Sequence, residues 1–257
     1  MNVFKYQVAS LLALFIVSTH IVAEPERIYR VGVEDVPYYP LQDFRAPENK
    51  GVLASILRLF EEKQGISIEF IPLPIHRFSS WYDDGGIDFR IPDNPTWTDK
   101  LHPELKFSSP VLQLCNSTIV LAKNADKPPS EIKSIGTLFG FTPSNHWRSR
   151  IERGEMELIT DSSTKVLTRM LLNEMVDGLD LDYSAIRHEV RELGHDVETV
   201  DVYRSVSQAL VSYQMSTLHH EGILNQFNDF LQNHRDEIIT IKKNFDVLSN
   251  SDCKYEL

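Results

Sequence analysis

Residues 52–73, "VLASILRLFEEKQGISIEFIPL", join a helical pattern to a strand pattern across a single glycine. Val52, Ile56 and Phe60 recur at the spacing of one helix face, and Gly65 is a typical residue at which a helix stops. The stretch after it, "ISIEFIPL", is short and rich in β-branched residues, so we predict a strand. A helix that leads directly into a strand is the repeating unit of an α/β fold.

The sequence on both sides continues this alternation. We predict a strand over residues 28–33, a helix over "RFSSWYDDGG" (77–86) and a third strand over "IDFRI" (87–91). Strands separated by helices imply right-handed crossovers and a mainly parallel sheet. The first part of the chain therefore has the pattern of an α/β lobe.

A second series of strands and helices follows a break. Residues 124–131, "NADKPPSE", have the composition of a turn or linker between lobes. Helical patterns resume after it over residues 146–154, 162–175 and 183–194. We interpret this series as a second lobe.

The last part of the chain is expected to return to the first lobe. Residues 209–218 are predicted as a strand, and the helical segment 219–245 carries an apolar stripe that needs a core to cover. Placing this stripe against the first lobe gives residues 24–120 plus 214–257 as lobe 1 and residues 121–213 as lobe 2. Two chain crossings would then join the lobes and form a hinge, with a cleft between them.

Residues 1–23 have the features of a cleavable secretory signal. Lys5 precedes an uncharged apolar run over residues 8–17, and the stretch after it ends at Ala23. The alternative is a membrane anchor, but the run is shorter than the roughly 20 residues that span a bilayer. No cysteine lies near the cleavage site to accept a lipid. We expect an exported, soluble protein that begins near Glu24.

The charge balance argues against nucleic acid as a partner. The chain has 26 Lys and Arg against 37 Asp and Glu, a formal net charge of -11, and the basic residues are scattered among acids. Binding to phosphate backbones favours clustered Lys and Arg. We interpret the excess acid as a solvated surface, and 42% hydrophobic residues are typical of a globular protein.

Two cysteines occur, Cys115 and Cys253. In an exported protein so sparse a pair favours one disulfide over a metal site, and the alternative is two unpaired thiols. The bridge would stabilise the fold by about 4 kcal/mol in the loop-entropy model. His219 and His220 do not suggest a metal site, because adjacent residues on a helix point apart and no nearby acid completes a ligand set.

Several segments resemble one protein family in their order and spacing. "YRVGVEDVPYYPL" (29–41), "FSSPVL" (107–112) and "MVDGLDLDYSAI" (175–186) are similar to segments of the bacterial extracellular solute-binding family 3, and the resemblance covers almost the whole mature chain. Members are periplasmic receptors for polar amino acids and similar small molecules. The resemblance implies the type II periplasmic-binding-protein fold, in which two α/β lobes close on a ligand at the hinge. It implies no catalytic residue, no cofactor and, usually, an ABC permease as partner.

The resemblance also implies where a ligand carboxylate would bind. The family commonly uses an arginine twelve positions after the aspartate of the third strand, and counting from Asp88 gives Lys100. Lysine supplies charge but not the two-pronged hydrogen bond of a guanidinium. Arg77 and Arg90 are the candidates to compensate. Arg90 either pairs with Asp88 on its strand face or reaches the cleft, and the alternative for Arg77 is an exposed position on a helix.

The loop "PDNPTW" after the third strand is predicted to form the first lobe's side of a ligand pocket. Asn94 and Thr96 offer hydrogen bonds and Trp97 offers a flat apolar wall, although these polar groups can also serve only to stabilise a turn. Tyr38 and Tyr39 match the family's aromatic platform, where a ring stacks on a ligand or a cation. We expect at least one of the two to face the cleft.

In the second lobe, Asp182 is the best single candidate, because it matches the family's acid that meets a ligand amino group. Asp180 is close enough to be confused with it, and the alternative role of Asp182 is to cap the helix predicted from Tyr183. Hydroxyl groups and helix-start amides that would bind an anionic group are expected at Thr142, Ser144, Ser163 and Thr164.

The function indicated is periplasmic binding of a small polar solute, an amino acid or a related zwitterion or cation, by a monomer that delivers it to an ABC permease. In one alternative, the closed receptor docks on a membrane signalling protein. In another, the same architecture acts as a dehydratase, which would need a cleft acid or base of adjusted pKa that the sequence alone does not identify. We expect no metal, no nucleic acid partner and no stable membrane insertion.

Overall fold

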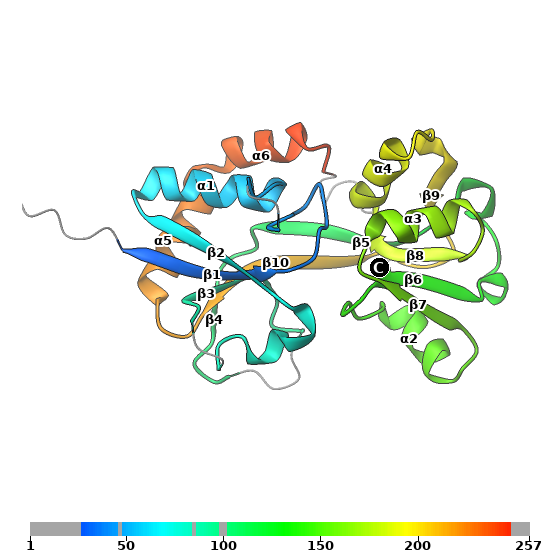
Figure 1. The fold of residues 1–257 in the computed structure, drawn as a ribbon, viewed down its shortest axis with the longest axis horizontal. Helices are drawn as coiled ribbons and strands as arrows, with labels where there is room; N and C mark the ends of the chain where they lie inside the picture. The colour runs from blue at the N-terminus through cyan, green and yellow to red at the C-terminus, as the bar shows by residue number, and fades with distance from the viewer. Residues whose placement is uncertain (1–26, 46–47, 84–85, 98–101, 248–257) are drawn as a thin grey trace, which may run out of the picture.

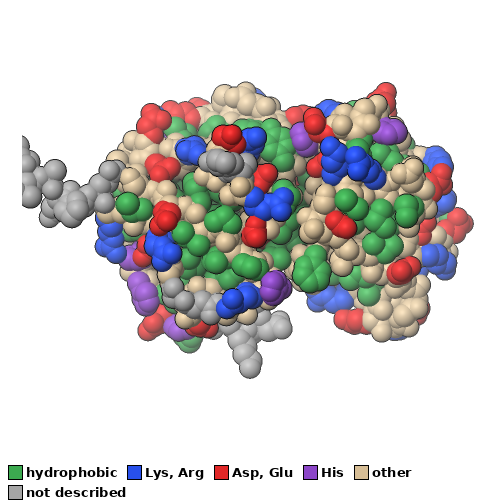
Figure 2. Space-filling view, in the orientation of Figure 1, with side chains coloured by type: hydrophobic (Ala, Val, Ile, Leu, Met, Phe, Trp, Pro, Cys, Tyr) green, Lys and Arg blue, Asp and Glu red, His purple; other side chains and the backbone are tan. Residues whose placement is uncertain are grey.

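The computed structural model describes residues 27–45, 48–83, 86–97 and 102–247. This part of the chain forms two lobes joined by two long strands, β5 (Leu112–Leu121) and β10 (Ala209–Thr217) (Figure 1). The predicted signal segment, Lys100 and Cys253 lie outside the described residues. No helix within the described ranges is both long and apolar enough to cross a membrane. On the face shown in Figure 2, acidic and basic side chains are intermixed over both lobes.

The first lobe combines a parallel sheet with helices from both ends of the chain. β1 is the middle strand between β2 and β3, with parallel pairing on both sides, and α1 connects β1 to β2 as predicted. In chain order the elements are β1 (Ile28–Glu34), α1 (Val52–Gln64), β2 (Ser67–Leu73), the 3-10 helix η1 (Ile75–Ser80), β3 (Phe89–Asp93), β4 (Lys106–Phe107), α5 (Glu221–Asn233) and α6 (Arg235–Asn244).

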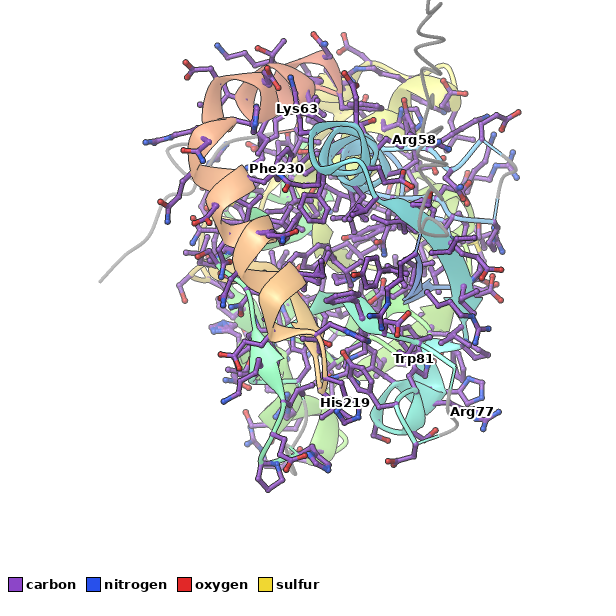
Figure 3. The ribbon with its side chains drawn as sticks, turned by 90° about the vertical axis from the view of Figure 1, so that its left-hand side faces the viewer. Arg58, Lys63, Arg77, Trp81, His219 and Phe230 are labelled. Carbon is purple, nitrogen blue, oxygen red and sulfur yellow. The ribbon has the colours of Figure 1, made fainter. Side chains whose placement is uncertain are left out.

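The C-terminal helices pack on α1, as their apolar stripe predicted. The Phe60 ring of α1 lies 4.9 Å from that of Phe227 and 5.2 Å from that of Phe230, measured between centroids, and both partners belong to α5. Figure 3 shows Phe230 between α5 and α1. A further link joins α1 to α6, because Lys63 and Glu237 form an ion pair at 3.3 Å.

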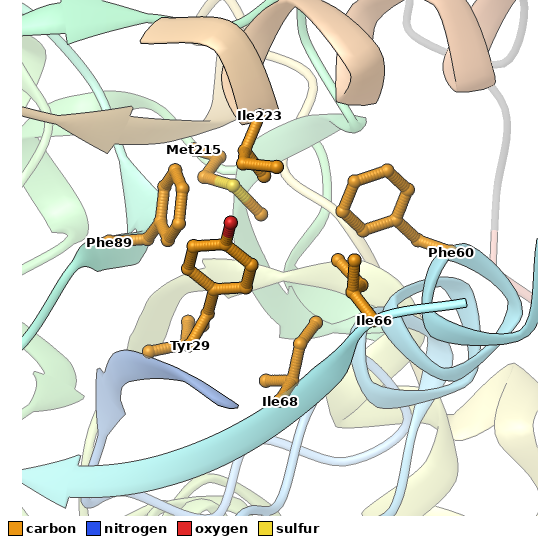
Figure 4. A pocket seen from close by; sticks show the side chains of 8 residues that line it. Tyr29, Phe60, Ile66, Ile68, Phe89, Met215 and Ile223 are labelled. Carbon is orange, nitrogen blue, oxygen red and sulfur yellow. The ribbon is translucent and has the colours of Figure 1, made fainter. Parts of the chain in front are cut away.

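An apolar cluster fills the space between this sheet and the helices. The Tyr29 ring extends toward Met215 and Ile223, with Phe60 and Phe89 on either side (Figure 4). The space among these side chains leaves no volume that a water molecule could occupy. We therefore interpret it as packed core and not as a ligand site.

The helix predicted over residues 77–86 is only partly present. A 3-10 helix, η1, begins earlier and ends at Ser80. Beyond it Trp81 turns into the lobe, where it is 2% exposed and its indole N–H donates to the Pro74 carbonyl at 3.1 Å. This anchoring replaces a further helical turn, which the local pattern alone did not reveal.

The second lobe repeats the same arrangement around its own middle strand. β6 lies between β7 and β8 with parallel pairing on both sides, α3 and α4 cover one face of the sheet, and α2 covers the other (Figure 1). The elements are η2 (Ala122–Asn124), η3 (Pro129–Glu131), β6 (Ser134–Leu138), α2 (Asn145–Glu152), β7 (Glu157–Asp161), α3 (Thr164–Leu172), β8 (Gly178–Asp182), α4 (Tyr183–Glu192), η4 (Val197–Thr199) and β9 (Val200–Val202).

The two crossing strands make the sheets mixed rather than mainly parallel. β5 and β10 pair with each other over residues 112–116 and 209–213. β10 then pairs with β3 and β4 in the first lobe, and β5 pairs with β8 and β9 in the second. Each antiparallel pairing among the described strands includes β5 or β10, because β5 leads the chain from the first lobe to the second and β10 leads it back. The two predicted crossings are present, while the residue limits of the lobes stay a prediction.

Candidate functional site

The two lobes meet where strands of both sheets end. Tyr38 follows β1, and its hydroxyl oxygen accepts the backbone N–H of Asp182, at the end of β8, at 2.6 Å. The edge of the Tyr38 ring also faces Phe141 of the second lobe, with centroids 5.5 Å apart. Tyr38 is 2% exposed and Asp182 is 5% exposed, so this contact is shielded from solvent. Two candidates from opposite lobes are thus brought together at the strand ends, where ligands bind in α/β folds.

Asp182 also caps a helix, which was its alternative role. Its Oδ1 accepts the backbone N–H groups of Ser184 and Ala185 at 2.9 and 3.3 Å, at the start of α4. Burial raises the pKa of Asp182 to about 6, and these backbone hydrogen bonds offset part of that rise. The capping role and a place in the cleft are therefore compatible, because one residue provides both.

Glu34, at the end of β1, is a second buried acid at this site, and the sequence analysis did not select it. It is 2% exposed, and the side-chain amide of Gln42 donates to its Oε2 at 2.5 Å. Burial raises its pKa to about 8; the Gln42 hydrogen bond opposes this rise and the charge of Asp93 adds to it. An acid at the end of an apolar strand, "VGVE", was the signal available in the sequence.

Two tyrosines connect Glu34 with Asp182. Burial raises the pKa of the Tyr38 hydroxyl, and the charges of Asp182 and Glu34 raise it further. Burial likewise raises the pKa of Tyr213 on β10, again with contributions from Glu34 and Asp182. Tyr38 and Tyr213 therefore lie close enough to Glu34 of the first lobe and Asp182 of the second to be affected by the charges of both.

Arg90 does not pair with Asp88, which was one of the two positions expected for it. It pairs with Asp93 through Nε at 2.8 Å and Nη2 at 2.6 Å, its Nη1 donates to the Phe78 carbonyl at 2.8 Å, and both charged side chains are buried. The guanidinium also lies over the rings of Phe78 and Tyr82, at 3.9 and 5.1 Å. Asp88 instead pairs with His220 at 2.8 Å.

The Asp93 carboxyl is held by more than this ion pair. Ser216 of β10 also donates to it, and its other oxygen accepts the backbone N–H of Asn94 at 2.7 Å. Burial still raises the pKa of Asp93, although the charge of Arg90 lowers it. The register of β3 and β10 shifts between Gln214 and Ser216, and this irregularity could not be read from the β3 sequence.

The loop after β3 is largely an internally bonded turn. The Asn94 side-chain oxygen accepts from the backbone and hydroxyl of Thr96 at 2.9 and 2.7 Å, and its amide donates to the Ser212 carbonyl at 2.8 Å. Trp97 is 39% exposed and packs edge-on against Tyr213, with centroids 5.6 Å apart. Trp97 is therefore the candidate of this loop that lies beside the acidic site and keeps a free surface.

The remaining candidates lie on other parts of the two lobes. The Tyr39 ring contacts His188 of α4, with centroids 4.5 Å apart. Arg77 is exposed on η1 and lies at the outer edge of the lobe in Figure 3, and Thr142 is exposed between β6 and α2. Ser163 and Thr164 lie at the start of α3.

The two hydroxyl groups at the start of α3 both have partners. The Ser163 hydroxyl accepts the backbone N–H of Val166 at 3.3 Å, and the Thr164 hydroxyl donates to Glu189 at 2.9 Å. Both hydroxyls expected to meet an anion therefore have partners in the protein. Within the residues that the structure describes, no three His, Cys, Asp or Glu side chains converge as ligands for a metal.

Comparisons with known proteins agree with this architecture. A scan against family models and a search of curated proteins find no match. Solved structures do match, among them an ancestral arginine-binding protein bound to arginine, which is 16% identical, with a TM-score of 0.66 over 85% of this chain and 97% of that one. An arginine transport periplasmic binding protein from Legionella pneumophila is 13% identical, with a TM-score of 0.63 over 84% and 98% of the two chains.

A third match is an ancestral amino-acid-binding protein that is a precursor of cyclohexadienyl dehydratase, 16% identical with a TM-score of 0.64 over 85% of this chain and 94% of that chain. At these identities the likeness shows the fold. The chain has the two-lobe, type II periplasmic-binding-protein fold, with its cleft at the hinge. The fold implied by the resemblance to solute-binding family 3 is confirmed, and its structural neighbours include substrate-binding proteins of amino-acid ABC transporters.

Proposed function

We propose that this protein binds a small polar solute, an amino acid or a related zwitterion or cation, by closing its lobes, and presents it to an ABC permease. The observation that carries the proposal is the buried contact between Tyr38 and the backbone of Asp182, which lies beside acidic side chains of both lobes. A ligand that touches both lobes stabilises the closed arrangement and so shifts the population toward it.

The proposal includes export to the periplasm after cleavage near Ala23, action as a monomer, and a bridge between Cys115 and Cys253. Cys115 is buried in β5, which is compatible with a bridge but does not test it, since Cys253 lies outside the described residues. The mass of the mature protein, measured with and without reductant, reports both the cleavage site and the bridge.

Removing the Asp182 charge is expected to weaken binding. The mature protein is screened by thermal shift against amino acids, polyamines, short peptides and organic acids. Each compound that binds (a hit) is then titrated into the native protein and into the Asp182→Asn variant, and the two affinities are compared. We expect a loss of affinity of at least about tenfold, because a buried charged contact is removed. Asp196→Asn is the matched control, since Asp196 caps η4 by the same kind of hydrogen bond at an exposed position. Equal affinities in Asp182→Asn and the native protein would contradict the site.

Closure itself is tested at Gly140. A Cβ atom there would lie 2.3 Å from the Ile75 side chain of the other lobe, and its φ of +92° disfavours any side chain. Gly140→Ala is expected to weaken binding of a hit by about tenfold, because the clash holds the lobes apart. Adding Ile75→Ala should restore part of this affinity. Gly154→Ala controls for strain alone, because Gly154 has a φ of +70° and nothing within 4 Å.

Docking on a membrane sensor would leave these binding results unchanged. Neighbouring genes separate the two outcomes: permease genes favour transport, and sensor genes favour signalling. The dehydratase alternative gains one specific observation, the buried Glu34 whose pKa is raised to about 8, which is a property of general acids. We propose binding without turnover, so mass spectrometry should recover the bound hit unchanged after long incubation.

A further inference from the structure

We infer that the cleft takes a cationic amine without a carboxylate, whose ammonium or guanidinium group is held by Glu34, Gln42 and Asp182. This inference rests on the proposed binding function and narrows its ligand class. Three observations carry it: the charges buried at the site, the occupation of the helix starts, and an unpaired amide oxygen.

The charges buried at the site are unbalanced. Among the described residues, the buried charged side chains are four acids and one arginine: Glu34, Asp93, Asp180, Asp182 and Arg90. Arg90 is already paired with Asp93 by two hydrogen-bonded contacts. Three buried acids are left without a cation from these residues, and a buried carboxylate is costly unless it is paired. A positive ligand supplies what the site lacks, whereas a ligand carboxylate would add to the repulsion.

Four backbone N–H groups at helix starts of the second lobe are already bonded to the protein's own side chains. Backbone N–H groups at a helix start are the usual place for a ligand carboxylate. At the start of α2 the N–H of Ser144 is bonded to Asp180 at 2.6 Å, and at the start of α4 two N–H groups are bonded to Asp182. The Val166 N–H of α3 is taken by Ser163. These four amides are therefore less available to a ligand carboxylate.

Gln42 gives an independent indication of the missing group. Its side chain is fully buried, its amide nitrogen is bonded to Glu34, and its Oε1 has no hydrogen-bond partner among the described residues. Both amide atoms are attached to one carbon, so the unpaired oxygen lies next to the Glu34 carboxyl. Two backbone hydrogen bonds with Tyr38, at 2.8 and 3.0 Å, fix Gln42 in the turn that reaches Asp182.

An amine cation matches this set of acceptors. An ammonium group donates three hydrogen bonds and accepts none, and a guanidinium group donates five. Glu34 is protonated at neutral pH in the protein alone, and a bound cation favours its ionised form. Ionised Glu34 and the Gln42 oxygen then offer only acceptors, and Asp182 adds negative charge from the other lobe. Trp97, which is 39% exposed and packs on the buried Tyr213, provides aromatic surface for the methylene chain or for the cation itself.

The test compares amines with the amino acids from which they differ only by a carboxylate. The mature protein is titrated calorimetrically with agmatine against L-arginine, cadaverine against L-lysine, and putrescine against L-ornithine. We expect at least one amine to bind, and to bind at least about tenfold more tightly than its amino acid. The Glu34→Gln substitution should weaken binding of that amine at least about 30-fold. The control substitution Glu62→Gln, on the exposed face of α1, should leave the affinity for the amine unchanged.

Tighter binding of the amino acid in each pair would overturn the inference and leave the proposed function intact. Absence of binding by all six compounds would also overturn it, and the proposed function would then depend on the wider solute screen. Circular dichroism of each variant verifies folding. If Glu34→Gln does not fold, Gln42→Leu is the second variant, because it removes the unpaired oxygen and keeps a similar side-chain volume. It should weaken binding of the amine at least about fivefold. Unchanged affinity in the folded variant would contradict the assignment.

Discussion

Replacing Arg90 with methionine is expected to lower the free energy of unfolding by about 3–5 kcal/mol, because it leaves Asp93 buried without its partner. Both side chains of this pair are buried, and Asp93 already has a raised pKa in spite of Arg90. Without Arg90 its pKa rises further, so the loss should be smaller at pH 5, where the carboxyl takes up a proton more readily. Urea unfolding followed by circular dichroism measures the change.

A matched control uses an ion pair on the surface. Arg153 and Glu155 form a short ion pair whose side chains are 56% and 50% exposed. Arg153→Met should therefore lower the free energy of unfolding much less than Arg90→Met does. The double variant Arg90→Met with Asp93→Leu should recover at least half of the loss, since no uncompensated charge remains. Equal stabilities of the two single methionine variants would contradict the structural role assigned to Arg90.

Stability is expected to fall as the pH rises from 6 to 8.5, by about 3 kcal/mol attributable to Glu34. The pKa of Glu34 is about 8 in the folded protein, above its ordinary value of 4.5. Between these two values the folded state holds a proton that the unfolded state has lost, so the folded state is penalised as the pH increases. Asp182, with a pKa of about 6, contributes mainly below this range.

The measurement is the free energy of unfolding in urea, determined for the native protein and for Glu34→Gln at pH 6 and at pH 8.5. Glutamine has no titrating group, so the variant should lack this part of the pH dependence and should be the more stable protein at pH 8.5. Glu62→Gln, which changes an exposed glutamate of α1, should keep the native dependence. Parallel curves for the native protein and Glu34→Gln would show that Glu34 is not held neutral in the fold.

Much of the fold could be predicted from local patterns. The helix that ends at Gly65 and the strand after it are present as α1 and β2, because helical spacing and a glycine stop are local signals. The antiparallel course of β5 and β10 was not predictable in the same way, since it depends on where the chain returns in space. The 3-10 helix at Ile75–Ser80 likewise depends on the inward packing of Trp81.

The candidate site was predicted less completely than the fold. Tyr38 and Asp182 were selected and do meet, because strand ends in an α/β fold converge on one edge. Arg90 was expected to pair with Asp88 or reach the cleft, but its partner is Asp93, which is held by Ser216 from a distant strand. Asn94 and Thr96 bond to each other, so the local interpretation of the turn describes them well. Glu34 was missed because its burial and its bond to Gln42 belong to the folded structure and leave no mark in the strand pattern.

The central claim is that both lobes donate acidic groups to one ligand. Its most direct measurement is the dissociation constant of a single bound amine in the native protein, in Glu34→Gln from the first lobe and in Asp182→Asn from the second. We predict that each substitution weakens binding at least about tenfold, while Glu62→Gln and Asp196→Asn do not. A loss confined to one lobe, or no loss in either, would contradict a site shared between the lobes.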